Sequence, residues 1–390
     1  MAEAAALEGG HSYQSLQEKY RDFSHPVAQI LLGGTPISAQ NEDVVVNDVQ
    51  VELTSGFEAS LASFRIYGAY DMERGGYLYD SVSGFLELGK TVEIQMGYLD
   101  NAELVFAGYI TGMTFGYEEG SLPFIEVTAM DVKGVLMGGS YACSLTAKTY
   151  SDAVKEILDR SGLYRMSGTK QKLGEPIIEN TPDAQGTQNG NSSSPITMEM
   201  VGESDYEFIV RAAKRYNFEF FVDRGVTVFR PAKKNTTVLM DLAIGSGLRD
   251  FHITYSVTGV VGNVEARAMN PGTGKCISSK QEYNTIIPGE TAGKVVGSGA
   301  RVYVDPSIQS QSDADSRAKY MMERMSYRLG ELEALCVGIP ELVPGRFINV
   351  SGLGKPVDNR FYITKVIHSL DANNGYSTRL EGCASAIKAE

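Results

Sequence analysis

Residues 88–136 decide how this sequence folds, and they read LGKTVEIQMGYLDNAELVFAGYITGMTFGYEEGSLPFIEVTAMDVKGVL. Apolar and polar residues alternate in three runs, at 91–98, 104–115 and 123–130, and a period of two is typical of half-buried strands. Turn residues separate the runs, at Asp100-Asn101 and at Glu119-Gly120. The stretch therefore predicts three successive strands.

The same pattern extends toward the N-terminus. Residues 44–53 and 60–67 also alternate, so at least five short strands fall within about 100 residues. That density of short strands is typical of a small barrel or sandwich. Before them, residues 12–23 predict a short polar helix on a tail of small residues.

Part of this pattern returns near the C-terminus. A turn with Gly and a basic residue precedes an alternating strand at Gly89-Lys90 and again at Gly345-Arg346. A long strand then begins with the same three residues, 20 residues after Gly89 and 17 residues after Gly345: Tyr109, Ile110 and Thr111 in the first case, Tyr362, Ile363 and Thr364 in the second. Coincidence and duplication both explain two such matches. A duplicated β-domain would make each chain a pseudo-twofold repeat, able to mimic two subunits of a ring.

The middle of the chain changes to a helical period. Thr149–Asp152 and Ser204–Glu207 resemble capping boxes, each followed by an apolar helix face, and Asp223–Gly225 predicts a hairpin turn. A third helix is expected at about 312–329, and strands at 251–269, 331–338, 346–350, 361–371 and 375–381. Residues 167–195 and 270–300 have no periodicity and many Gly and small polar residues, so they predict loops that are mobile or ordered only by a partner.

These patterns predict a β-rich α+β chain with two related small β-barrels and α/β insertions. The expected divisions are an N-terminal tail and helix (1–24), a first barrel (25–140), an insertion domain (141–250) and a second barrel (251–390).

Composition excludes several classes of function. The 390 residues include 48 Asp and Glu against 35 Lys and Arg, a formal charge of −13, which disfavours specific binding to nucleic acid or to anionic membranes. We expect no span across a membrane, since there is no run of about 18 apolar residues, and no secretory signal.

Motifs for catalysis are missing from the sequence. The four cysteines form no CxxC pair and the four histidines have no metal-binding spacing, and the Gly-rich stretches lack the remaining residues of a phosphate loop. We therefore expect no enzyme activity, no catalytic or metal-binding residues and no cofactor. His252 and His368 lie in strand patterns and are expected to be packed or hydrogen-bonded.

Three segments, which carry four motifs in order, are similar to the phage late control D family, which includes baseplate hub proteins of contractile tails and the N-terminal half of type VI secretion spike proteins. Residues 88–136 match its strand pattern, 144–163 its capped helix, and 202–229 its "SD-x-x-F" helix and hairpin, within a resemblance covering residue 40 to the end. The matching positions, together with those of the internal repeat, are Gly89, Gly97, Phe106, Gly108, Ile110, Thr111, Asp131, Leu136, Ser204, Asp205, Phe208, Arg211, Ala212, Gly345, Tyr362, Ile363 and Thr364.

The resemblance implies a structural hub that forms a homotrimer, with six barrels in a ring joining a sixfold tail tube to a threefold spike. Its partners would be tail tube proteins, a spike that is a separate polypeptide because the chain ends at Glu390, and baseplate wedge proteins. The hub would be made in the bacterial cytoplasm and built into a phage tail, a tail-like bacteriocin or an extracellular injection particle. Two alternatives stay open: a tail-associated cell-wall hydrolase, and a receptor- or glycan-binding tail protein.

The net charge of the chain predicts where acidic residues lie in such a ring. A ring of three chains would hold −39, and we expect a disproportionate share of Asp and Glu to line the channel, with Glu118, Glu119 and the residues near Asp100 as candidates. The alternative is that the excess charge only keeps the outer surface soluble.

Overall fold

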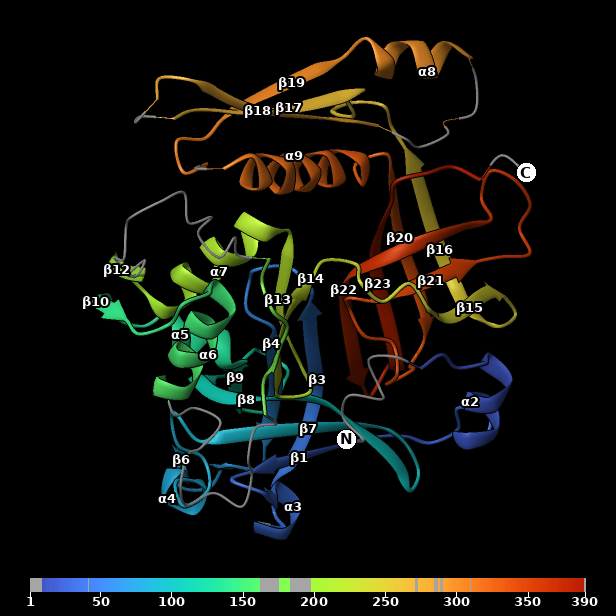
Figure 1. Ribbon diagram of the computed structural model, residues 1–390. Coiled ribbons are helices and arrows are strands. Elements are labelled where there is room, and N and C mark those ends of the chain that lie inside the picture. The colour runs from blue at the N-terminus through green and yellow to red at the C-terminus, as the bar shows by residue number, and fades with distance from the viewer. Residues whose placement is uncertain are drawn as a thin grey trace.

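The computed structural model describes residues 9–40, 42–161, 175–182, 198–270, 273–283, 287, 290–308 and 310–388. Two β-rich halves join edge to edge, and two α/β insertions lie beside them (Figure 1). The fold class expected from the sequence is confirmed: the chain is β-rich, with a closed six-stranded barrel and further strands that continue it.

The first half is a sheet of six main strands in the order β1-β7-β8-β9-β4-β3. All its neighbours are antiparallel, and β7 to β9 are the three strands expected from residues 88–136. The strands are β1 (Pro26–Leu32), β3 (Val45–Thr54), β4 (Leu61–Tyr67), β7 (Thr91–Tyr98), β8 (Asn101–Gly116) and β9 (Phe124–Met130). Short elements lie between them: β2 (Thr35–Pro36), α3 (Ile37–Gln40), β5 (Tyr70–Asp71), β6 (Gly76–Tyr77) and α4 (Tyr79–Val82).

The second half closes into a barrel, because β22 and β23 pair in addition to the sheet order β22-β21-β15-β16-β20-β23. Its strands are β15 (Val238–Ile244), β16 (Gly247–Tyr255), β20 (Gly330–Val337), β21 (Phe347–Val350), β22 (Asn359–Asp371) and β23 (Gly375–Ala384). β16 spans the domain boundary expected at residue 250. One continuous hydrophobic core runs through both halves, from Ile30 in β1 to Leu380 in β23.

The first insertion follows β9 and has its own core, in which Ile157, Phe208, Phe220 and Phe229 are fully buried or nearly so. Its elements are α5 (Val132–Leu136), β10 (Tyr141–Leu145), α6 (Tyr150–Ser161), β11 (Ile177–Ile178), β12 (Met198–Glu203), α7 (Asp205–Tyr216), β13 (Phe218–Asp223) and β14 (Val226–Pro231). The hairpin expected at Asp223–Gly225 is confirmed: Arg224 and Gly225, both with positive φ, turn β13 into β14.

The second insertion interrupts the barrel between β16 and β20. It packs a three-stranded sheet on a helix and comprises β17 (Asn263–Met269), β18 (Cys276–Glu282), α8 (Glu290–Gly297), β19 (Ala300–Val304) and α9 (Gln311–Ser326). Figure 1 shows it above the rest of the chain, with α9 beneath the sheet.

Several sequence predictions are wrong here. The strand character expected at 251–269 is present in two strands, β16 and β17. The stretch 270–300, in contrast, contains β18 and α8, because hydrogen bonding to β17 orders a sequence without a clear period. The third helix begins earlier than residue 312, since Ser310 and Asp313 form its capping box, and it ends at Ser326. Of the loop predicted at 167–195, residues 167–174 and 183–195 lie outside the described residues, and Ile177–Ile178 forms β11.

The predicted N-terminal helix is α2 (Tyr13–Lys19), capped by Ser12. This helix and the residue that follows it contact both halves and connect them. Lys19 Nζ forms ion pairs with Glu103 in β8 at 2.7 Å and with Glu341 before β21 at 2.8 Å. The Tyr20 hydroxyl also donates a hydrogen bond to Glu341, at 2.7 Å. The N-terminal segment is therefore part of the shared core and not a loose tail from residue 9 onward.

Candidate assembly surface

The repeated Gly turns have the same hydrogen bonds in both halves. Gly89 N donates to Ile110 O at 2.8 Å and Ile110 N donates to Lys90 O at 2.9 Å. The second copy matches: Gly345 N donates to Ile363 O at 3.0 Å, and Ile363 N donates to Arg346 O at 2.8 Å. Gly89 and Gly345 have φ of +82° and +80°, a region that residues with a Cβ rarely adopt. The sequence repeat is therefore a structural repeat.

The residue after each repeated isoleucine is a β-bulge. Register shifts between Ile110 and Gly112 in β8, and between Ile363 and Lys365 in β22, so one extra residue lies in each strand. The Thr111 and Thr364 hydroxyls donate to the carbonyls of Thr128 at 3.3 Å and Glu381 at 3.1 Å, which are corresponding positions on β9 and β23. Such bulges bend the strand at the same place in both halves.

The repeat includes all six main strands of each half. In chain order, β1, β3, β4, β7, β8 and β9 correspond to β15, β16, β20, β21, β22 and β23, and the neighbours within each sheet correspond too. Two features differ. β1 pairs antiparallel with β7, whereas β15 pairs parallel with β21. β15 and β16 pair and close the second barrel, whereas β3 pairs with β22 of the second half and not with β1. The first six strands therefore form an open sheet that continues the barrel.

Two glycines of the family pattern allow close approach of the backbone. A Cβ on Gly97 would lie 2.1 Å from the Asn101 carbonyl oxygen, and one on Gly108 would lie 2.1 Å from that of Met130. Phe106, between them in the pattern, is 1% exposed in the core. These positions serve packing of the sheet.

Asp131 joins the first sheet to the first insertion. Its carboxylate accepts hydrogen bonds from Ser60 N and Lys133 N, both at 2.9 Å, and caps α5. Lys133 is fully buried and donates to the carbonyls of Gly56 and Glu58 in the turn after β3. Burial raises the pKa of the Asp131 carboxyl, and the adjacent Lys133 ammonium opposes that rise. Leu136 is buried in the insertion core.

The five family positions around α7 fix that helix. Ser204 and Glu207 form the predicted capping box, and Phe208 is buried, as is Ala212. Asp205 pairs with Arg160 of α6 at 2.5 Å, and Arg211 pairs with Glu203 at 2.6 Å. Each side chain binds another part of the same insertion, so this motif is structural.

Tyr362 connects the barrel to the first insertion. Its buried hydroxyl donates a hydrogen bond to Glu219 of β13, which also pairs with Arg230 at 2.6 Å, and Arg230 donates to Gly345 O at 3.0 Å. Burial raises the pKa of Glu219, and Arg230 opposes that rise. The hairpin β13–β14 thus packs on the second Gly turn. Sequence reasoning identified Tyr362 and Gly345 but not their partners, which lie more than 100 residues away.

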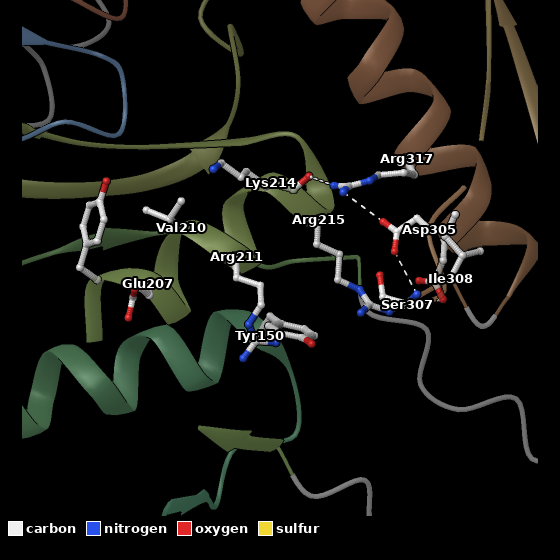
Figure 2. A pocket seen from close by; sticks show the side chains of 12 residues that line it. Tyr150, Glu207, Val210, Arg211, Lys214, Arg215, Asp305, Ser307, Ile308 and Arg317 are labelled. Carbon is white, nitrogen blue, oxygen red and sulfur yellow. Dashed lines mark hydrogen bonds and ion pairs between the residues drawn. The ribbon is translucent and has the colours of Figure 1, made fainter. Parts of the chain in front are cut away.

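A cavity of about 440 Å³ lies between α7 and the segment from β19 to α9 (Figure 2). Three arginines line it, but each has an acidic partner: Arg211 pairs with Glu203, Arg215 with Asp313 at 3.5 Å, and Arg317 with Asp305 at 3.0 Å. Arg317 also donates to Lys214 O at 2.8 Å. Of these contacts, the Arg215–Asp313 pair and the hydrogen bond from Arg317 to Lys214 O join the two insertions.

Among the described residues, no cluster of three or more His, Cys, Asp or Glu side chains is arranged to hold a metal ion. Within the same residues, no helix has both the length and the apolar character required to cross a bilayer.

The fold is that of phage tail proteins. The structure is similar to the tail protein from Neisseria meningitidis MC58, with a TM-score of 0.65, 13% identity, and coverage of 92% of this chain and 97% of that one. The 43 kDa tail protein of prophage MuSo2 from Shewanella oneidensis has the same TM-score, with 14% identity and coverage of 92% and 98%. The E. coli c3393 protein, a component of the type VI secretion system, has a TM-score of 0.51, 13% identity and coverage of 93% and 77%.

The chain also matches a protein-family model. The model of the Alg8 N-terminal domain matches residues 27–372, and the chain belongs to that family. No curated protein matches the chain by sequence. The expected resemblance to tail and baseplate proteins is confirmed at the level of the fold.

Proposed function

We propose that this chain is the structural hub of a contractile tail or injection-system baseplate, and that three copies form a ring between the tail tube and a spike protein. The observation that carries the proposal is the internal repeat: two six-stranded units with the same strand order joined edge to edge in one chain. Three chains supply six such units, which meet a sixfold tube, while the two unlike insertions repeat only three times. The tail-protein fold and a structural role in a tail agree with this assignment.

Under the same proposal, one face of the sheet lines the channel. Eight strands form a continuous sheet in the order β8-β9-β4-β3-β22-β23-β20-β16, and one of its faces is core. The other face, here called the open face, carries side chains that are exposed or half-buried. Its charged members are Glu52, Glu126, Asp250, Glu331, Glu333 and Glu381 against Arg65, Lys365 and Arg379.

These nine side chains comprise six acidic and three basic residues, and by the same alternation Asp48 of β3 and Asp371 of β22 also lie on this face, so acidic residues predominate on it. Repulsion between like charges in a narrow channel keeps an anionic cargo such as DNA or an acidic protein from binding to the wall. Of the candidates from the sequence, Glu119 and Asp100 lie in turns at the ends of strands. Glu118 follows β8 and pairs with Arg65 of the open face at 3.7 Å, so it stays a candidate for the channel wall.

Electron cryomicroscopy of the particle that contains this chain tests the proposal. We expect three copies in one ring where the tube meets the spike, with the open face toward the axis. Six copies or one copy at that place would refute the trimer. A position outside the tube–spike axis would refute the hub. A peptidoglycan-cleavage assay and a glycan array on the purified chain, both expected to be negative, separate the hub from the hydrolase and adhesin alternatives.

A further inference from the structure

Among the described residues, the strands of the two halves pair with each other along one edge of β22. That edge is divided: residues 359–362 pair with β21, and residues 365–370 pair with β3. Ser55 N, just beyond β3, donates to Thr364 O at the division, at 3.0 Å. The bulge at Thr364 thus separates a pairing within the barrel from the pairing between halves.

β8, the counterpart of β22, has the same divided edge, but half of it is open. β7 pairs with residues 101–109, up to the Gly turn. Beyond the bulge at Thr111, β8 pairs with β9 on one side, and no other described strand lies along its second side. This open edge comprises residues 112–117, of which Phe115 and Tyr117 are 45% and 65% exposed.

β16, the counterpart of β3, also has an open edge. Its residues 250–255 pair with β20, as β3 pairs with β4, and both strands have a bulge at the start of that pairing. On its other side, β16 is paired with β15 only at Gly247 and Leu248; the described residues provide no further strand there. The open edges lie at opposite ends of the eight-stranded sheet, with β8 on the left of Figure 1 and β16 on the right.

We propose that these two edges pair with each other between copies of the chain, so that β8 of one copy binds β16 of the next as β22 binds β3 within each copy. This interface rests on the proposed ring and identifies the surface that closes it. Pairing is head to tail, because the two edges differ, and head-to-tail contacts form a ring when the rotation between copies closes, which the proposed trimer requires after three copies.

The internal junction fixes the register. In it, Val366 faces Leu53, His368 faces Val51 and Leu370 faces Val49. The pairings with β9 and β23 align 113, 115 and 117 of β8 with those three β22 residues. The pairings with β4 and β20 align 255, 253 and 251 of β16 with the three β3 residues. The predicted facing pairs are Met113 with Tyr255, Phe115 with Ile253, and Tyr117 with Phe251.

The side chains provide a check that the derivation of the register did not use. Every pair on the core face is apolar on both strands, and these residues are exposed or half-buried in the single chain. On the open face, the pairs are Gly112 with Ser256, Thr114 with Thr254, and Gly116 with His252, all small or polar. A shift by one residue would place the apolar side chains against polar ones, so the pattern selects the register taken from β3 and β22. Two unpaired edges with exposed aromatic residues also require a partner to avoid indiscriminate pairing.

Disulfide trapping in assembled particles tests this register. In a background with Cys143→Ser and Cys276→Ser, which removes the two cysteines least buried in the chain, the variant carries Thr114→Cys and Thr254→Cys. Facing residues of antiparallel strands have Cα atoms about 4.5–5.5 Å apart, within the range for a disulfide. The matched control carries Thr114→Cys and His252→Cys on the same face, a diagonal pair about 7–8 Å apart.

We expect mild oxidation to convert most of the Thr114→Cys/Thr254→Cys chains into covalent dimers and closed trimers that reductant dissolves, with at least a fivefold lower yield for the control. An equal or higher yield from the control would overturn the register. No cross-link in either variant, in particles whose images show a ring of three, would overturn the interface and leave the hub intact. No ring at all would refute the proposed function itself. Unfolding curves of both variants, compared with the parent chain, show whether each substituted chain is folded.

Discussion

Lowering the pH should weaken the junction between the two halves through His368. This side chain lies on β22 opposite Val51 of β3 and is fully buried. Its Nε2 donates to Leu342 O at 3.2 Å, because a carbonyl can only accept, so Nδ1 accepts from the hydroxyls of Thr378 at 3.1 Å and Tyr376 at 3.0 Å. A second proton would have to replace those two donors, and burial lowers the pKa of His368 to about 3.

The size of the effect follows from the two pKa values. The unfolded chain binds a proton on this histidine below its ordinary pKa of 6.5, and the folded chain does not until about pH 3. The stabilisation that neutral His368 gives the folded chain is therefore fully present above pH 6.5 and is lost as the pH falls toward 3. With 1.36 kcal/mol per unit, the free energy of unfolding should fall by about 2 kcal/mol between pH 7.5 and pH 5 from this group alone.

Urea unfolding at both pH values measures this change, and the His368→Gln variant isolates it. Glutamine keeps a donor and an acceptor but does not titrate, so its pH dependence should be about 2 kcal/mol smaller than that of the parent chain. Carboxyl groups with raised pKa, such as Glu219, act with the opposite sign and cancel in the comparison. Equal pH dependence in His368→Gln and the parent, or an NMR titration of His368 near 6.5, would refute the reasoning.

Four further substitutions test the repeat and the packing around it. Gly89→Ala and Gly345→Ala should each lower the free energy of unfolding by about 1–2 kcal/mol, because both glycines have positive φ. Gly345→Ala should lose more, since its Cβ would lie 3.1 Å from Phe221, whereas a Cβ on Gly89 would have no atom within 4 Å. Equal losses in urea unfolding would contradict this. Ser204→Ala should cost about 0.5–2 kcal/mol by removing the α7 capping box, and an unchanged midpoint in the same assay would contradict it. Tyr20→Phe should lower the free energy of unfolding by about 1–3 kcal/mol, measured by thermal unfolding, because buried Glu341 loses a hydrogen-bond donor. A stability equal to that of the parent chain would argue against a role for the N-terminal helix in joining the two halves.

Local patterns in the sequence predicted local structure well. The β7 strand falls at the predicted residues, and β8 and β9 lie close to theirs, because alternation reflects a sheet with one buried face. The capping box at Ser204 and the hairpin at Arg224-Gly225 were predicted because their chemistry lies within a few adjacent residues. The internal repeat was visible as well, since the Gly turn and the Tyr-Ile-Thr strand require particular residue types.

Features set by distant partners could not be predicted in this way. β15 runs parallel to β21, and β10 pairs with β12 across the first insertion, so neither strand has a turn signal that identifies its partner. β18 was taken for loop because its strand state depends on β17. The open edges of β8 and β16 are properties of the whole sheet, and a single sequence does not record which neighbour a strand lacks.

The pairing of β3 with β22 has a consequence for synthesis. β3 leaves the ribosome more than 300 residues before its partner strand, a delay of about 15–60 s at ordinary rates of translation. During that interval, the edge of β3 that will pair with β22 has no partner strand, because β22 has not yet been synthesised. The first half can therefore reach its native state only after translation of β22, and incomplete chains lack the finished sheet that presents both outer edges. In the proposed ring, completion of the polypeptide would therefore precede assembly, and truncated products would not enter the particle.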